Sequence, residues 1–156
     1  MSAMRLHFTW SDAWVLAAIA IAGDVDGASV KEIIAAGDAI NGTLFTPKEL
    51  RRGVAKLTRA GHARFDGELF SIAGTARDFG IKLLKRKNSA FCVMLAFEAF
   101  LDAEPYSIDA QSSEKDQDWP FQSLGDELVV AACKSYREET AGSCDERASS
   151  MRARVA

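Results

Sequence analysis

The stretch from Thr46 to Ala60 constrains the fold more than any other part of the chain, because it predicts one helix with a defined start, a defined end and two unlike faces. Thr46 followed by Glu49 has the spacing of a capping box, and Pro47 suits the first helical position. Gly61 comes next, and glycine commonly ends helices. At helical spacing one face is apolar and the other basic, with Leu50, Val54 and Leu57 on the first and Lys48, Arg51, Arg52, Lys56 and Arg59 on the second. A fold built around this helix buries one side and presents cations on the other.

A β-hairpin is predicted directly after this helix. The dipeptide Asp66-Gly67 separates two runs of β-prone residues, 62–65 and 68–72. Asp-Gly between such runs is a strong signal for a two-residue turn. The basic helix therefore leads straight into a small antiparallel ribbon.

Five further helices are predicted from hydroxyl residues at capping positions and from apolar residues at helical spacing. They span residues 12–22 after Ser11, 30–41 after Ser29, 76–87 after Thr75, 90–103 after Ser89, and 124–138. The connection over residues 42–45 is short enough for a helix-turn-helix. Residues 105–119 are polar and acidic, so we expect a loop there, and residues 140–156 are expected to form a frayed tail.

The charge of the chain is unevenly distributed, although its 156 residues carry a net charge of only −3. Residues 46–87 contain eleven basic and four acidic side chains, and the segments on either side are acidic. A polyanion would therefore meet one basic segment and not a basic protein. The simpler alternative is an ordinary solvated face. The length suits one domain with an extension, which we divide into a domain over 1–87, a helical extension over 88–139 and a flexible tail over 140–156.

The order of helix, helix, short turn, helix and hairpin across residues 10–75 resembles the winged helix-turn-helix superfamily. The resemblance covers fewer than half of the residues and rests on element order, capping, the break at Gly61 and the turn signal of the hairpin. It implies a mostly α-helical fold with a small β-hairpin wing and additional C-terminal helices. It also implies that the helix from Thr46 is the recognition helix and that Phe65–Phe70 forms the wing.

The basic face of the 46–60 helix is the candidate nucleic-acid-binding site. Arginine can bond guanine bidentately or grip a phosphate as a fork. The expected function is therefore the binding of double-stranded DNA by a small bacterial-type transcriptional regulator, which inserts this helix into the major groove. The predicted contacts are Lys48, Arg51, Arg52, Lys56 and Arg59 from the helix and Arg64 from the hairpin.

A homodimer is expected from the helix over residues 90–103. This helix is apolar nearly all round, so it is buried either in its own domain or in a partner. The helix over 12–22, with Trp10 and Trp14 four residues apart at its start, is the second candidate for the dimer contact. Such a dimer would place two recognition helices on two half-sites.

Two departures from the winged-helix pattern favour other functions. The turn of the hairpin contains Asp66 and Glu68, whereas a wing that grips phosphate usually carries Lys or Arg. The acidic segment 24–28 also leaves little room for the strand that usually precedes the second helix. The alternative is a protein–protein interaction module of the same shape, whose basic helix binds an acidic partner.

The surroundings of the 46–60 helix separate these alternatives. Cations from Lys82–Lys87 beside it would favour DNA, and carboxylates from 102–118 over it would favour protein binding. A third possibility is a small-molecule sensor, which needs a pocket among C-terminal aromatic residues. Those residues are otherwise expected to be core, and they are Phe91, Phe97, Phe100, Trp119, Phe121 and Tyr136.

Catalytic and metal-binding functions lack support in the sequence. The chain contains no nucleophile elbow, no phosphate-binding loop and no HExxH motif, so no catalytic residues are expected. His7 and His62 are the only histidines, and neither has a partner at ligand spacing. We therefore expect neither a metal nor another cofactor.

The cysteines predict a reducing, cytoplasmic compartment. Their number is odd and none forms a CxxC pair, the three being Cys92, Cys133 and Cys144. No basic stretch followed by an apolar core begins the chain, so no signal peptide is expected. The longest apolar run, residues 13–22, is about half of the roughly 20 residues that a membrane helix needs, so no membrane contact is expected.

Overall fold

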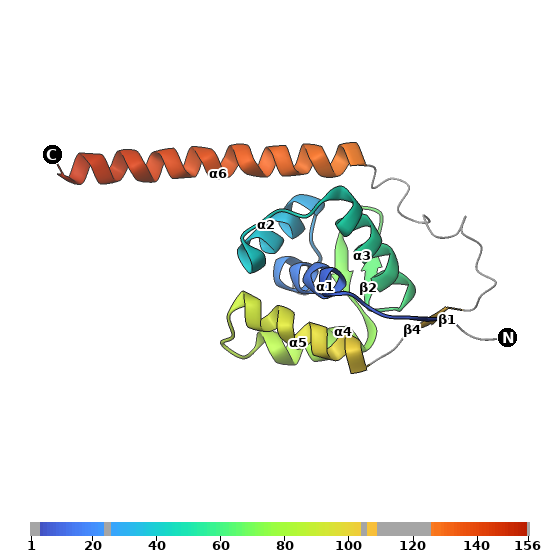
Figure 1. Cartoon of the computed structure of the whole chain (residues 1–156). Coiled ribbons are helices and arrows are strands. Elements are labelled where there is room, and N and C mark those ends of the chain that lie inside the picture. Colours follow the sequence, from blue (N-terminus) through green and yellow to red (C-terminus); the bar gives the residue numbers. More distant parts are fainter. Residues whose placement is uncertain (1–3, 24–25, 104–105, 109–125, 156) are drawn as a thin grey trace.

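The computed structural model describes residues 4–23, 26–103, 106–108 and 126–155 (Figure 1). Over these residues the fold is mostly helical with two small antiparallel sheets, which confirms the predicted mostly α-helical class and the hairpin. The elements in chain order are β1 (Met4–Leu6), α1 (Trp10–Gly23), α2 (Val30–Asn41), α3 (Pro47–Arg59), β2 (Ala63–Phe65), β3 (Phe70–Ile72), α4 (Gly74–Leu84), α5 (Ala90–Ala103), β4 (Tyr106–Ile108) and α6 (Asp126–Val155).

Helix α1 forms the centre of the molecule. Its residues from Asp12 to Ala20 are all buried, and α2, α3, α5 and β3 pack around it (Figure 1). The helix starts earlier than expected, and its N-cap is Thr9, so the prediction of Ser11 as the cap was wrong. The Thr9 N–H donates to Asp12 Oδ2 at 2.7 Å, and the Asp12 N–H donates to Thr9 Oγ1 at 3.4 Å. This reciprocal pair has the spacing of a capping box with aspartate in place of glutamate.

The predicted starts of α2 and α3 are confirmed. At each start the hydroxyl of the N-cap residue accepts a backbone N–H three residues on, and the glutamate at that position accepts the N-cap N–H. The pairs are Ser29 with Glu32 and Thr46 with Glu49. Each box satisfies two amide groups that a helix start otherwise leaves without a partner.

The end of α3 is also the predicted one. Gly61 has a φ of +78°, which residues other than glycine rarely adopt. Its N–H donates to the Thr58 carbonyl at 3.1 Å, and the His62 N–H donates to the Leu57 carbonyl at 2.9 Å. These two bonds form a Schellman motif, which stops α3 and directs the chain into β2.

The hairpin has a different register from the predicted one. Phe65 pairs with Phe70, so Gly67 and Glu68 form the tip in place of Asp66 and Gly67. The Asp66 carboxylate explains the shift, because its Oδ1 accepts the two backbone N–H groups that follow Gly67, at 2.9 and 2.8 Å. Gly67 takes the positive φ of 107° that this turn requires.

One residue between α1 and α2 joins the hairpin. Ala28 forms an isolated antiparallel bridge with Phe70, in which the Ala28 N–H donates at 2.7 Å and the Phe70 N–H donates at 2.9 Å. Ala28 belongs to the acidic segment 24–28, in which we expected little room for a strand. Its pairing with the hairpin is limited to this isolated bridge. This bridge ties the entry of α2 to the hairpin that follows α3.

Helices α4 and α5 lie below α1 in Figure 1, and α2 and α3 lie above it. Helix α4 follows Ala73, whose side chain makes no capping bond, so the expected cap at Thr75 was wrong. It ends at Leu84, and residues 85–89 connect it to α5. Ser89 is confirmed as the cap of α5, because its Oγ accepts the Cys92 N–H at 3.2 Å.

Helix α5 belongs to the same hydrophobic core as α1. Its buried residues are Val93, Met94, Phe97 and Leu101, and α1 is its main neighbour. The core therefore continues across the boundary that the sequence placed between residues 87 and 88. The side of α5 that faces away from α1 is exposed.

The pairing of β1 with β4 was not predicted. Met4 pairs with Ile108 and Leu6 with Tyr106 in an antiparallel ladder. Strand β4 lies inside the stretch 105–119 that we expected to be a loop. Residues 109–119, like Phe121, lie outside the described residues.

Helix α6 is longer than the predicted helix over 124–138. It runs to Val155, so the backbone of the expected tail is helical up to that residue. Val129 is buried, and α2 is the main neighbour of α6. Figure 1 shows the C-terminal half of α6 extending beyond the rest of the molecule.

Candidate nucleic-acid interface

Helix α3 is oriented by its apolar face. Leu50, Val54 and Leu57 are buried in the core. Gly53 lies against α1, where an added Cβ would come within 2.8 Å of Val15 Cγ2. This close approach of two helices determines which side of α3 faces outward.

The outer side of α3 carries a row of three cations with one small residue among them. The row consists of Lys48, Arg52, Ala55 and Arg59, which share one side of a helix because they are spaced by four, three and four residues. Lys48 and Arg52 are exposed, and Ala55 and Arg59 are half-buried. Arg51, also half-buried, lies on one flank of this row. No Asp or Glu occupies the row. Three of the six predicted contacts, Lys48, Arg52 and Arg59, therefore lie together on one side of α3.

Lys56 does not belong to this row. Its Nζ lies 2.7 Å from Asp12 Oδ2 and 3.0 Å from the His7 carbonyl oxygen, and 5.8 Å from the centre of the Phe8 ring. The side chain of Asp12 is only 4% exposed, so the ammonium compensates a buried carboxylate. The structure thus corrects the expectation that Lys56 faces a groove: it lies on the flank of α3 next to the start of α1.

The hairpin carries charges of both signs. Arg64 is exposed on β2, and Glu68 is exposed at the tip. The Asp66 carboxylate accepts backbone hydrogen bonds from Leu69 and Glu68, and these bonds lower the pKa of Asp66 below its ordinary value. The Asp66 carboxylate, next to the tip, therefore keeps its negative charge to a lower pH than an ordinary aspartate does.

The second basic cluster lies away from α3. Lys82 and the cations at 85–87 are exposed at the end of α4 and in the connection that follows it. Figure 1 places α4 on the other side of α1 from α3. These cations therefore do not extend the row on α3. Most of the acidic segment 102–118 lies outside the described residues.

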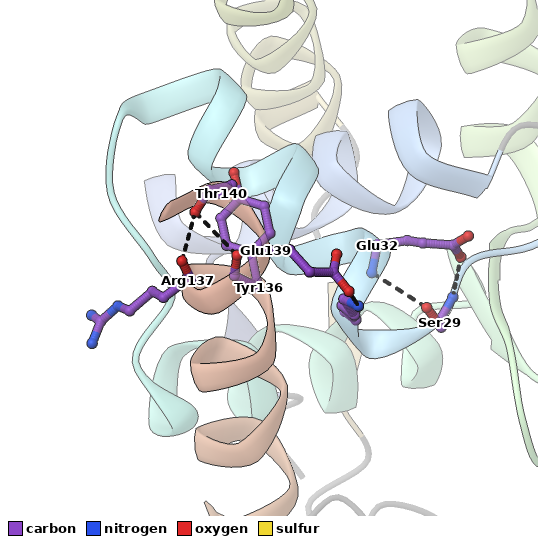
Figure 2. A network of polar contacts seen from close by, with 7 residues as sticks. Ser29, Glu32, Tyr136, Arg137, Glu139 and Thr140 are labelled. Atoms are coloured by element: carbon purple, nitrogen blue, oxygen red, sulfur yellow. Dashed lines mark hydrogen bonds and ion pairs between the residues drawn. The ribbon is translucent and has the colours of Figure 1, made fainter. Parts of the chain in front are cut away.

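Helix α6 is fastened to α2 by side-chain contacts. The Tyr136 hydroxyl donates to Asp38 Oδ2 at 2.8 Å, and this bond raises the pKa of the Tyr136 phenol. Glu139 also forms an ion pair with Lys31, in the first turn of α2. Figure 2 shows Glu139 reaching from α6 toward α2. It also shows the Thr140 hydroxyl bonded to backbone carbonyls one turn earlier in α6. With α6 in this position, Lys48 and Arg52 on α3 stay exposed.

Of the aromatic residues that a sensor would need, Phe97 and Phe100 pack on Phe79. Phe91 is exposed, so the expectation that it belongs to the core was wrong. The Phe79 ring lies 5.6 Å from that of Phe97 and 4.9 Å from that of Phe100, between centroids.

Among the residues that the structure describes, no group of three or more His, Cys, Asp or Glu side chains could hold a metal ion. Within the same residues, no helix combines the length and the apolarity that crossing a membrane requires.

Asp12 and Ala55 are the residues of this region that the sequence did not single out. Ala55 could have been found from its spacing to Arg52 and Arg59. The capping role of Asp12 has a local signal, its position three residues after Thr9. Its ion pair with Lys56 has none, because Lys56 lies on a different helix.

Comparison of the chain with models of known protein families, with curated proteins and with solved structures finds no match. The winged helix-turn-helix resemblance therefore stays a prediction from the order of the elements.

Proposed function

We propose that this protein is a DNA-binding winged-helix protein, a small bacterial-type transcriptional regulator that inserts α3 into the major groove of double-stranded DNA. The observation that carries the proposal is the row of Lys48, Arg52 and Arg59 along the outer side of α3. The order of α1, the Ala28 bridge, α2, α3 and the hairpin supports the winged-helix assignment. The regulator acts in the reducing cytoplasm that the cysteine pattern predicts.

The dimensions of the row suit a groove. Lys48 and Arg59 are eleven residues apart, or about 16 Å along the helix axis. The major groove is about 12 Å wide and admits a helix. The short side chain of Ala55 lets α3 approach the base edges, and exposed Arg52 beside it can bond guanine bidentately. Lys48 and Arg59, near the two ends of the helix, are placed for phosphates, and Arg51 contacts the backbone from the flank.

The hairpin contributes one favourable and one unfavourable charge. Arg64 can bond a phosphate beside the groove, as a wing does. Exposed Glu68 at the tip repels phosphate, so it lowers the affinity that the cations on α3 supply. DNA binding by this protein is therefore expected to depend on α3 more than on the hairpin.

The competing function is protein–protein interaction through the same face. The exposed Glu68, on the same hairpin as exposed Arg64, favours it, because mixed charges suit a protein partner better than a phosphate backbone. An acidic peptide would then bind Lys48 and Arg52.

A salt series separates the two functions. Fluorescence anisotropy with labelled random-sequence duplex DNA would compare the wild type with Lys48→Glu/Arg52→Glu. The matched control is Lys82→Glu/Lys85→Glu, which makes the same change in charge at exposed positions near the end of α4. The wild type is expected to bind with a log–log salt slope of about −4, which corresponds to roughly four or five phosphates. The α3 variant should lose this binding, and the control should keep most of it.

Two results would overturn the proposal. One is a wild type that does not bind duplex DNA even at low salt. The other is an equal loss of affinity in both variants, because it would show a response to net charge and not to the surface of α3. In either case the α3 face should next be tested against an acidic peptide.

A further inference from the structure

The outer side of α5 is an exposed apolar surface. Phe91 is 47% exposed and Leu95 is 45% exposed. Cys92 and Ala99 are exposed beside them. Phe91, Leu95 and Ala99 are spaced by four, so they form one ridge along the helix. Large side chains exposed together in a ridge mark an interaction site more often than scattered ones do.

Charges of opposite sign lie at the two ends of this ridge. Exposed Lys85, Arg86 and Lys87 precede the start of α5, and exposed Asp102 lies near its end. Half-buried Glu98 lies one turn before Asp102, in the same C-terminal half of α5. An elongated surface with a basic end and an acidic end is complementary to itself when two copies run antiparallel.

We infer that this surface pairs with the same surface of a second copy of the chain, the two α5 helices running antiparallel across a two-fold axis at Leu95. Leu95 then meets its own counterpart, and Phe91 of each copy lies over Ala99 of the other, a large side chain against a small one. Asp102 is seven residues after the axis residue Leu95, and Lys87 is eight residues before it. Asp102 of each copy therefore lies opposite the segment that contains Lys87 of the other. Such a self-complementary contact is the isologous interface of a two-fold dimer.

The structure also excludes the other expected dimer helix. Residues Asp12–Ala20 of α1 are buried within the chain, and only Trp10 at its start is appreciably exposed, at 38%. Along α5, all of which the structure describes, Phe91 and Leu95 are the only large apolar side chains that are exposed. We therefore expect less than the ~800 Å² per partner of a standard interface, and a weak dimer with concentration-dependent assembly. The pairing does not rest on DNA binding, because α5 and α3 lie on opposite sides of α1 (Figure 1).

Sedimentation velocity over a range of protein concentrations, without DNA, tests the dimer. The wild type is expected to shift from monomer to dimer as concentration rises. Leu95→Glu places two carboxylates against each other at the axis and should weaken the dimer more than about tenfold. The matched control is Leu128→Glu, because Leu128 on α6 is 47% exposed and should not change the assembly. Circular dichroism of each variant checks that the fold is retained.

A charge swap tests the antiparallel register. Asp102→Lys should weaken the dimer, and adding Lys87→Glu to it should restore most of the affinity. In a chain whose cysteines are replaced by serine, Leu95→Cys should form an intermolecular disulfide on oxidation, and Asp78→Cys on α4 should not. A wild type that stays monomeric at every concentration overturns the inference. So does a dimer that survives Leu95→Glu, or one that responds equally to Leu128→Glu, because its interface would lie elsewhere.

Discussion

The ammonium group of Lys56 lies 2.7 Å from the carboxylate of Asp12, and this contact joins α3 to the start of α1. The same oxygen of Asp12 accepts the backbone N–H of Thr9 at 2.7 Å. One buried carboxylate thus caps α1 and also binds a side chain of α3. Cations on the exposed face of a helix usually contact solvent or a ligand, but Lys56 of α3 has a structural role.

Lys56→Met should destabilise the fold, because it leaves the Asp12 carboxylate without its cation. The loss is expected to be about 2 kcal/mol in the free energy of unfolding, typical of a hydrogen bond to a charged group. Arg52→Met, at an exposed position of the same helix, should change stability by less than about 0.5 kcal/mol. Urea denaturation of both variants measures the difference. Equal stability of the two would contradict the structural role of Lys56.

Gly37→Ala should also destabilise the fold, although alanine forms helices better than glycine. A Cβ at Gly37 would lie 2.3 Å from a ring carbon of Phe45, whose ring stands 3.9 Å from that of Trp14 between centroids. Overpacking of this kind costs about 1–3 kcal/mol. Thermal unfolding checks the loss, and Phe45→Leu added to Gly37→Ala should recover part of it. A Gly37→Ala protein more stable than wild type would show that the Phe45 ring can move away.

Tyr136→Phe should loosen α6 from α2. The hydroxyl bond to Asp38 is partly open to water, so its loss is expected to cost only about 0.5 kcal/mol. The pKa of Tyr136 is raised chiefly by that bond. A raised pKa means that the neutral phenol is favoured in the fold, so the contribution is complete below the unfolded pKa of about 10 and disappears as the pH rises through the folded pKa. Unfolding curves of both proteins should therefore converge in strongly alkaline solution, whereas a difference independent of pH would assign the effect to packing.

Glu68→Lys should strengthen the proposed DNA binding. The substitution replaces a repelled carboxylate at the hairpin tip by a phosphate-binding cation, and it should steepen the log–log salt slope by about 1. Asp78→Lys, the matching change at an exposed site on α4, should have little effect. Anisotropy titrations at several salt concentrations compare the two. If both variants gain equally, the hairpin does not approach DNA.

Features that depend on neighbouring residues could be predicted from the sequence. The capping boxes at Ser29 and Thr46 join positions three residues apart, and the stop at Gly61 needs only a glycine after an amphipathic run. The outer row of Lys48, Arg52 and Arg59 follows from helical spacing alone. These local signals are strong because the groups that interact are covalently close.

Features that depend on distant partners could not be predicted. The residues around Lys56 in the sequence do not indicate that it pairs with Asp12. The residues around Met4 likewise do not indicate that it pairs with Ile108. The hairpin register was wrong because the Asp66 side chain holds its own turn, which a pattern of β-prone residues does not reveal. Alternating apolar residues indicate that strands exist, but side-chain bonds at the turn decide which residues face each other.

The ladder between β1 and β4 has a consequence for the order of folding. Its two halves are Met4–Leu6 and Tyr106–Ile108, so the pairing closes a loop that contains all of α1 to α5. Contacts between residues so far apart in sequence raise the contact order and slow the step that makes them. During synthesis β1 leaves the ribosome before α1 to α5, yet it cannot form the ladder until β4 has been made. We therefore expect the ladder to form late, after the helical core has assembled.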